Sequence, residues 1–113
     1  IQLAAIEALT GDQSWIVERN QMYQERRDIV VAGLRAAGFT VDPPKATLYV
    51  WAKLPPGHTD SLAVSKWLLD EAGVWISSGS FFGSGGMEYV RATLTVPTDR
   101  LREAMDRLRR LAL

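Results

Sequence analysis

The sequence has 113 residues, 13 basic and 13 acidic side chains, and no cysteine. This length is enough for one domain with a core, so we expect a single domain over residues 1–113. Balanced charge argues against binding to nucleic acid or to anionic membranes. The lack of cysteine excludes disulfides, zinc thiolates and thiol nucleophiles. No apolar run approaches the roughly 20 residues of a membrane helix, and we expect a soluble, cytoplasmic protein.

The chain starts at Ile1, without an initiator methionine, inside an apolar and helix-favouring stretch. This start favours a fragment of a longer polypeptide. Good helix formers and a near-heptad apolar stripe then predict a long amphipathic helix over residues 13–37. Gly38 is a natural helix stop, and a short extended piece over residues 39–41 follows it.

Residues 46–54 alternate in polarity and predict a strand. The face expected in the core carries Leu48, Val50, Ala52 and Leu54, and the other face carries Thr47, Tyr49, Trp51 and Lys53. A helix is expected from Thr59 or Asp60 to about Ala72, because the first two can cap a helix and Gly73 can end it.

Residues 74–76 predict a short strand, and a glycine-rich loop over residues 79–86 leads into a third strand over residues 88–96. A last amphipathic helix begins near Pro97. The order helix, strand, helix, strand, strand, helix predicts an α+β two-layer sandwich. We expect a small, largely antiparallel sheet of three strands with the helices on one face.

The opposite face of this sheet would display aromatic and polar side chains, among them Tyr49, Trp51, Tyr89 and Arg91. A contiguous mixed surface of this kind usually meets a ligand or a partner. Arg91 lies in mid-strand, where its fork of N–H donors could bind a carboxylate or phosphate. An ion pair with Glu88 or with a helix acid is an equally good interpretation of the pattern alone.

Other candidates are weaker. The glycine-rich loop lacks nucleotide-binding spacing and a following helix, so a flexible hairpin connection is favoured over a phosphate site. His58 lies in a turn, and we expect it to be exposed. Ser65 and Lys66 are adjacent in a helix and do not face each other. The residues therefore predict no nucleophile, general base or metal site, and one candidate anion site.

Several segments together resemble the C-terminal part of class I/II pyridoxal-phosphate aminotransferases, nearest the branch with aspartate and LL-diaminopimelate aminotransferases. They are residues 23–28 (YQERRD), 46–55 (ATLYVWAKLP), 71–74 (EAGV), 79–80 (GS), 82–83 (FG) and 89–91 (YVR). They follow in the family's order over nearly the whole chain. The resemblance implies the small domain of a fold-type-I enzyme, beside a large cofactor-binding domain that this sequence does not contain.

In that family the arginine matched by Arg91 holds the substrate's α-carboxylate, so the resemblance gives Arg91 this role. The strand matched by residues 46–51 approaches the substrate in the family, so the resemblance implies that Leu48 or Tyr49 lines the substrate pocket. The parent enzyme would be a homodimer that uses pyridoxal 5'-phosphate to transfer an amino group between an amino acid and a 2-oxo acid. Ser78 departs from the family, because many relatives have proline there.

The Schiff-base lysine and the cofactor-binding residues of the family lie in the large domain. Lys45, Lys53 and Lys66 are the only lysines, and none has the catalytic-lysine context. We therefore expect no cofactor on this chain alone and no turnover. Two alternatives stay open: a free-standing, ferredoxin-like module that binds amino acids for regulation, and an oligomerisation domain.

Overall fold

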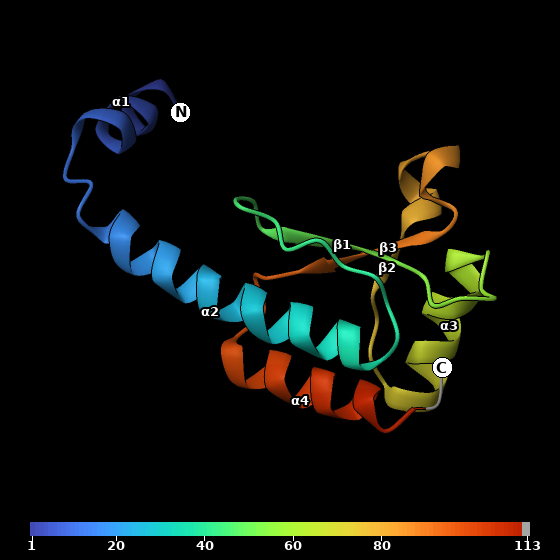
Figure 1. Ribbon diagram of the computed structural model, residues 1–113. Coiled ribbons are helices and arrows are strands. Elements are labelled where there is room, and N and C mark those ends of the chain that lie inside the picture. Colours follow the sequence, from blue (N-terminus) through green and yellow to red (C-terminus); the bar gives the residue numbers. More distant parts are fainter. Residues whose placement is uncertain (112–113) are drawn as a thin grey trace.

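The computed structural model describes residues 1–111, which form four α-helices and three short strands (Figure 1). The regular elements are α1 (Gln2–Thr10), α2 (Trp15–Ala36), β1 (Tyr49–Lys53), α3 (Ser61–Ala72), β2 (Ser77–Ser78), β3 (Tyr89–Thr93) and α4 (Thr98–Arg109). Two short 3-10 turns, η1 (Gly79–Phe82) and η2 (Ser84–Gly86), lie between β2 and β3.

The three strands form one antiparallel sheet in the order β1-β3-β2. The central strand β3 places Arg91 opposite Trp51 of β1 and opposite Ser77 of β2. A single bridge between Thr40 and Lys53 extends the pairing at the edge of β1. The α+β class and the antiparallel three-stranded sheet are therefore as the sequence predicts.

Helices α2 and α4 run along one face of the sheet, and the opposite face carries no α-helix in the described part of the chain, only the short turn η1 (Figure 1). Val30 and Leu34 of α2 are completely buried, as are Val50 of β1 and Val90 of β3. The two helices approach closely at Gly33, where an added Cβ would lie 2.4 Å from the Met105 side chain. One hydrophobic core thus joins the helix layer to the sheet.

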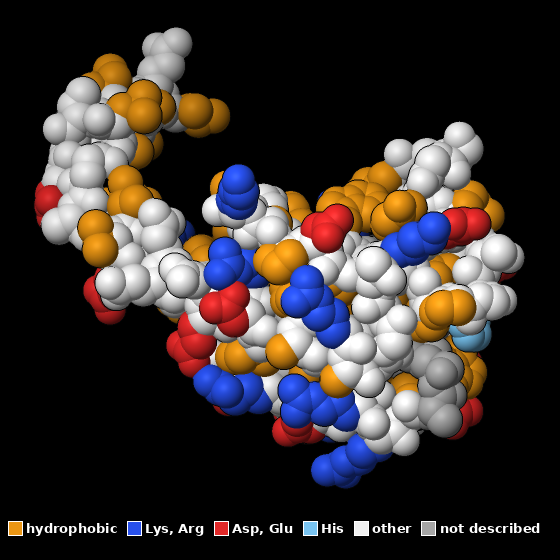
Figure 2. Space-filling model, viewed as in Figure 1, with side chains coloured by type: hydrophobic (Ala, Val, Ile, Leu, Met, Phe, Trp, Pro, Cys, Tyr) orange, Lys and Arg blue, Asp and Glu red, His pale blue; other side chains and the backbone are white. Residues whose placement is uncertain are grey.

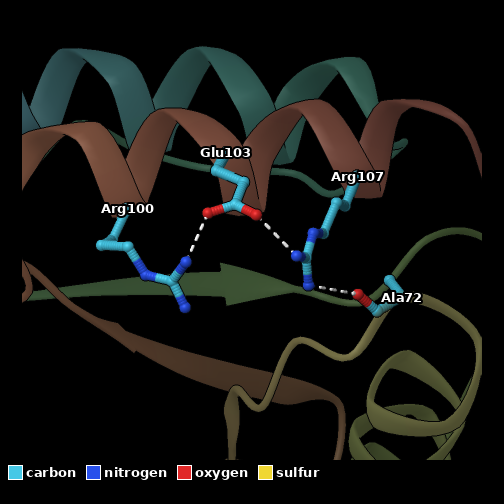
Figure 3. Close-up of polar contacts among 4 residues, drawn as sticks. All are labelled: Ala72, Arg100, Glu103 and Arg107. Atoms are coloured by element: carbon cyan, nitrogen blue, oxygen red, sulfur yellow. Dashed lines mark hydrogen bonds and ion pairs between the residues drawn. The ribbon is translucent and has the colours of Figure 1, made fainter.

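Helix α3 is tied to α4 at its C-terminal end (Figure 3). Glu103 binds the guanidinium groups of Arg100 and Arg107 at 2.6 and 2.5 Å. Arg107 also donates a hydrogen bond of 3.3 Å to the carbonyl of Ala72. Gly73 then ends α3 in the left-handed conformation, with φ of 64°. An arginine of one helix therefore satisfies the carbonyl end of another.

Several boundaries differ from the sequence-based expectation. The expected strand over residues 74–76 is wrong: Val74 and Ile76 are buried in the core, and pairing with β3 starts only at Ser77. The alternation of buried and exposed residues at 74–76 therefore comes from a connecting segment that packs on the core, and not from a paired strand. The strands expected over residues 46–54 and 88–96 are also shorter, and Leu48, expected in the core, is 39% exposed.

Helix α1 is an addition to the expected order. It has no buried residue, and the first turn of α2 is also exposed, with Trp15 at 49% and Val17 at 63%. We call residues 1–17 the N-terminal arm. Over residues 1–111, no helix combines the length and the apolar character needed to cross a membrane.

Candidate functional site

The side chains of interest gather on the face of the sheet that no α-helix covers. Period-2 alternation directs Tyr49 and Trp51 of β1, together with Arg91 of β3, to this open face. Tyr49 is 37% exposed and Trp51 is 42% exposed, whereas their neighbours Val50 and Ala52 are fully buried. The alternation predicted from the sequence is thus confirmed at β1 and β3.

Arg91 has no ion pair or side-chain hydrogen bond among residues 1–111. The carboxylate of Glu88, one of the partners considered from the sequence, lies 3.4 Å from the ammonium group of Lys53. Arg91 instead contacts two aromatic rings. Its Cζ atom is 4.1 Å from the centroid of Tyr49 and 4.1 Å from that of Phe82. The charge on Arg91 is therefore not compensated by an acid in the described part of the chain.

Phe82 comes from the loop that joins the antiparallel strands β2 and β3, so the hairpin connection expected from the sequence is confirmed. The loop folds as η1 and η2, and these two turns touch through glycines. An added Cβ at Gly79 would lie 2.3 Å from the carbonyl oxygen of Gly86, so no side chain fits there. This close approach fixes the turn that carries Phe82.

A chain of serine hydroxyls anchors the same loop to α3. The Ser61 and Ser78 hydroxyls are 2.7 Å apart, and both residues are completely buried. Ser78 and Ser80 are hydrogen-bonded over another 2.7 Å. Ser78, the position at which the sequence departs from the resemblance, therefore has a hydrogen-bonding role that proline could not supply.

Trp51 connects the loop to the sheet. Its ring meets Phe82 edge-on at 5.4 Å and Tyr89 at 6.4 Å between centroids. The three rings and the glycines Gly85 and Gly86 line a shallow cavity of about 430 Å³ next to Arg91. The open face thus combines one cation with an aromatic hollow.

The structure does not group Leu48 with this set. Leu48 precedes Tyr49, so its side chain points away from the face that carries Tyr49. It lines a separate cavity of about 340 Å³, together with Arg27 and Lys45. Its role in substrate binding stays a prediction. Phe82 is the residue that the sequence analysis missed, although an aromatic pair inside a glycine-rich loop was a usable signal.

The remaining titratable candidates are solvated. His58 and the lysines Lys45, Lys53 and Lys66 are all exposed, while Ser65 is buried with no partner for its hydroxyl in the described structure. A lysine that forms a Schiff base needs a desolvated or charge-perturbed environment. The three lysines do not fit a pyridoxal phosphate site, and we derive no step through that cofactor on this chain.

Known aminotransferases match this chain over nearly its whole length. The family model described as aminotransferase class I and II matches residues 1–108. An LL-diaminopimelate aminotransferase from Moorella thermoacetica is 45% identical over 111 residues, which are 98% of this chain and 28% of that protein. The enzyme of the same name from Syntrophobacter fumaroxidans is 46% identical over 112 residues, covering 99% and 29%.

Solved structures agree with this result. Apo-BacF from Bacillus subtilis superposes with a TM-score of 0.86 at 35% identity, over 98% of this chain and 30% of that one. An aromatic aminotransferase from Pyrococcus horikoshii gives 0.86 at 33% identity, over 96% and 30%. The chain thus spans less than a third of the length of these relatives. It belongs to the aminotransferase class I and II family.

Proposed function

We propose that this chain is the C-terminal small domain of a pyridoxal-phosphate-dependent aminotransferase and that Arg91 binds the α-carboxylate of the substrate. The observation that carries the proposal is the uncompensated guanidinium of Arg91 on the open face of the sheet, in a chain that matches the family over residues 1–108. The parent reaction would transfer an amino group between an amino acid and a 2-oxo acid.

The chemistry of Arg91 suits this role. A guanidinium presents its N–H groups in a planar fork that pairs with both oxygens of a carboxylate. Arg91 is partly buried and lies in the central strand β3, which pairs with β1 on one side and β2 on the other. The sheet therefore fixes the backbone of Arg91 before a ligand binds. Acid partners within residues 1–111 do not compete for it.

The rest of the enzyme belongs to the proposal as well. A large domain of the same polypeptide would supply the Schiff-base lysine and the cofactor site, and two such polypeptides would form a homodimer in the cytoplasm. The exposed apolar side chains of the N-terminal arm, including Leu3 at 84% and Leu9 at 81%, support the view that this chain packs against further protein. Figure 2 shows hydrophobic side chains along the arm, which stands clear of the body.

The first donor to test is LL-diaminopimelate, because relatives with 45% and 46% identity carry that name. No observation in the described part of the chain favours either alternative, a free-standing amino-acid-binding module or an oligomerisation domain, over this proposal.

The experiment is Arg91→Lys in the full-length enzyme, with transamination kinetics for several acids. Lysine keeps the charge and loses the bidentate fork, so we expect kcat/KM to fall by about 10- to 150-fold, equivalent to roughly 1.5–3 kcal/mol. Arg109→Lys is the matched control, because Arg109 pairs with Asp106 on α4. An unchanged kcat/KM for every acid in the Arg91 variant would refute the assigned role.

A further inference from the structure

We propose that Tyr49 and Phe82 are positioning residues for Arg91: their rings hold the guanidinium in place while leaving its N–H groups and its charge available to a carboxylate. The inference rests on the carboxylate-binding role proposed above for Arg91. It assigns a role to two aromatic side chains that the hydrophobic core does not need.

The contacts come from two different parts of the fold. Tyr49 is in β1, and Phe82 is the last residue of the turn η1, yet each ring centroid is 4.1 Å from the Cζ atom of Arg91. Two rings at this distance are well inside the range in which a cation is attracted to an aromatic face, about 6 Å. The guanidinium is thus restrained from the strand and from the loop.

Aromatic contacts restrain an arginine differently from an acid. A carboxylate partner would occupy the N–H edge and offset the charge, and a substrate would have to displace it. A ring engages the π face of the planar guanidinium and leaves the N–H edge open. Because Arg91 has no acid partner within residues 1–111, the rings are the side chains that restrain it there. Restraint before binding lowers the entropy that a ligand must overcome.

The placement of Phe82 is specific to that side chain. Its neighbour Phe81 lies on the same turn, is 59% exposed and makes no aromatic or cation contact in the described structure. Phe82 contacts both Arg91 and Trp51. The backbones of Gly79 and Gly86 lie in close contact. This contact holds the turn η1 in the conformation that directs Phe82, and not Phe81, toward Arg91.

The test uses the full-length enzyme with the variants Tyr49→Leu and Phe82→Leu. The readouts are KM and kcat in transamination, and the Kd of 2-oxoglutarate measured by calorimetry. Cation–π contacts of this kind predict that Kd and KM rise by about 3- to 30-fold, with a smaller change in kcat. Tyr49→Phe restores the ring that Tyr49→Leu removes, and its Kd should therefore be lower than that of Tyr49→Leu. Phe81→Leu, which removes the neighbouring ring, is the matched control and should leave Kd unchanged.

A double-mutant cycle with Arg91→Gln separates positioning from a general structural effect. If the rings act through Arg91, Tyr49→Leu and Phe82→Leu should have no further effect on Kd in the Arg91→Gln background. An effect of undiminished size in that background would overturn the inference.

The same experiment distinguishes the inference from the proposed function. If Arg91→Gln raises Kd while the two ring variants behave like Phe81→Leu, the positioning role is wrong and the carboxylate role of Arg91 stands. If Arg91→Gln itself leaves Kd unchanged, the proposed function is wrong and the inference falls with it.

Discussion

Both the N-terminal arm and the body of the molecule contain large apolar side chains, but these side chains are exposed in the arm and buried in the body. In the body, side chains such as Leu34, Leu68 and Leu94 are at most 1% exposed. In the arm, Leu3, Ile6 and Leu9 are 57–84% exposed, and no residue of α1 is buried. The arm rises from the start of α2 and does not return to the sheet (Figure 1).

The arm is held by local interactions. Thr10 donates to the carbonyl of Ile6, and the Gln13 amide donates to the carbonyls of Ala8 and Gly11. The body is held by contacts between residues distant in the sequence, such as the ion pair of 2.6 Å between Glu25 and Arg102 and the hydrogen bond from Arg26 to the carbonyl of Leu94. Local bonds specify a helix and a turn, whereas the burial that stabilises a tertiary structure is confined to the body.

Apolar residues therefore have different structural roles in the two regions. In the body, such residues stabilise the fold of this chain, and in the arm they provide a surface. Substitutions of the same type should therefore have different effects in the two regions.

The largest expected effect is on the body. Leu94→Ala removes a side chain that is 1% exposed and should lower the free energy of unfolding by about 2–5 kcal/mol, because it leaves a cavity in the core. Leu3→Ala in the arm, at a position that is 84% exposed, should change it by less than about 0.5 kcal/mol. Urea unfolding of the two variants checks both values. Equal losses would show that the arm belongs to the same cooperative unit as the body.

A smaller effect is expected in the loop of the body that carries Phe82. At Gly79 an added Cβ would meet the backbone oxygens of Gly86 and Tyr89 at 2.3 and 2.5 Å, so Gly79→Ala should cost about 1–3 kcal/mol. At Gly85, in the same loop, a Cβ would meet nothing within 4 Å. Gly85→Ala is therefore the control, and unfolding curves should separate the two variants. Equal stability would mean that the loop can move apart without cost.

The difference between buried and exposed apolar residues explains which parts of the fold could be predicted from the sequence. Period-2 alternation identified β1 and β3 and their buried faces, because one side of each strand meets the helices. Alternation failed at residues 74–76, where Val74 and Ile76 are buried in a segment without strand pairing. Periodicity reports burial, and it cannot tell whether a neighbouring strand supplies hydrogen bonds.

For the site, the sequence indicated Arg91 and its face but not its surroundings. The two rings against Arg91 are separated in sequence, at Tyr49 and Phe82, and the turn that directs Phe82 depends on the contact between Gly79 and Gly86. Such a contact is tertiary and leaves no periodic pattern. The resemblance to aminotransferases supplied a role for Arg91, and the structure supplied the neighbours through which that role can be tested.

The smallest expected effect is in the arm, at the turn between α1 and α2. Asp12 accepts hydrogen bonds from the backbone N–H of Ser14 at 2.9 Å and from its hydroxyl at 2.6 Å. The hydroxyl bond first, and then the backbone bond, lower the pKa of Asp12 below its usual value, against a small opposing effect of desolvation. A lowered pKa means that the ionised carboxylate favours this turn.

The stabilisation of the turn is therefore complete above the carboxyl's usual pKa of about 3.8 and is lost as the pH falls through the lowered pKa in the folded chain. We expect the amide resonance of Ser14 to move with pH in this acidic range, and the same resonance in Asp12→Asn to stay constant. Because α1 has no buried residue and the hydrogen bonds of Thr10 and Gln13 are local, thermal unfolding of the body at neutral pH should be the same for both proteins. A lower melting temperature for Asp12→Asn would show that the turn is coupled to the body, and the contrast between arm and body would then be one of exposure alone.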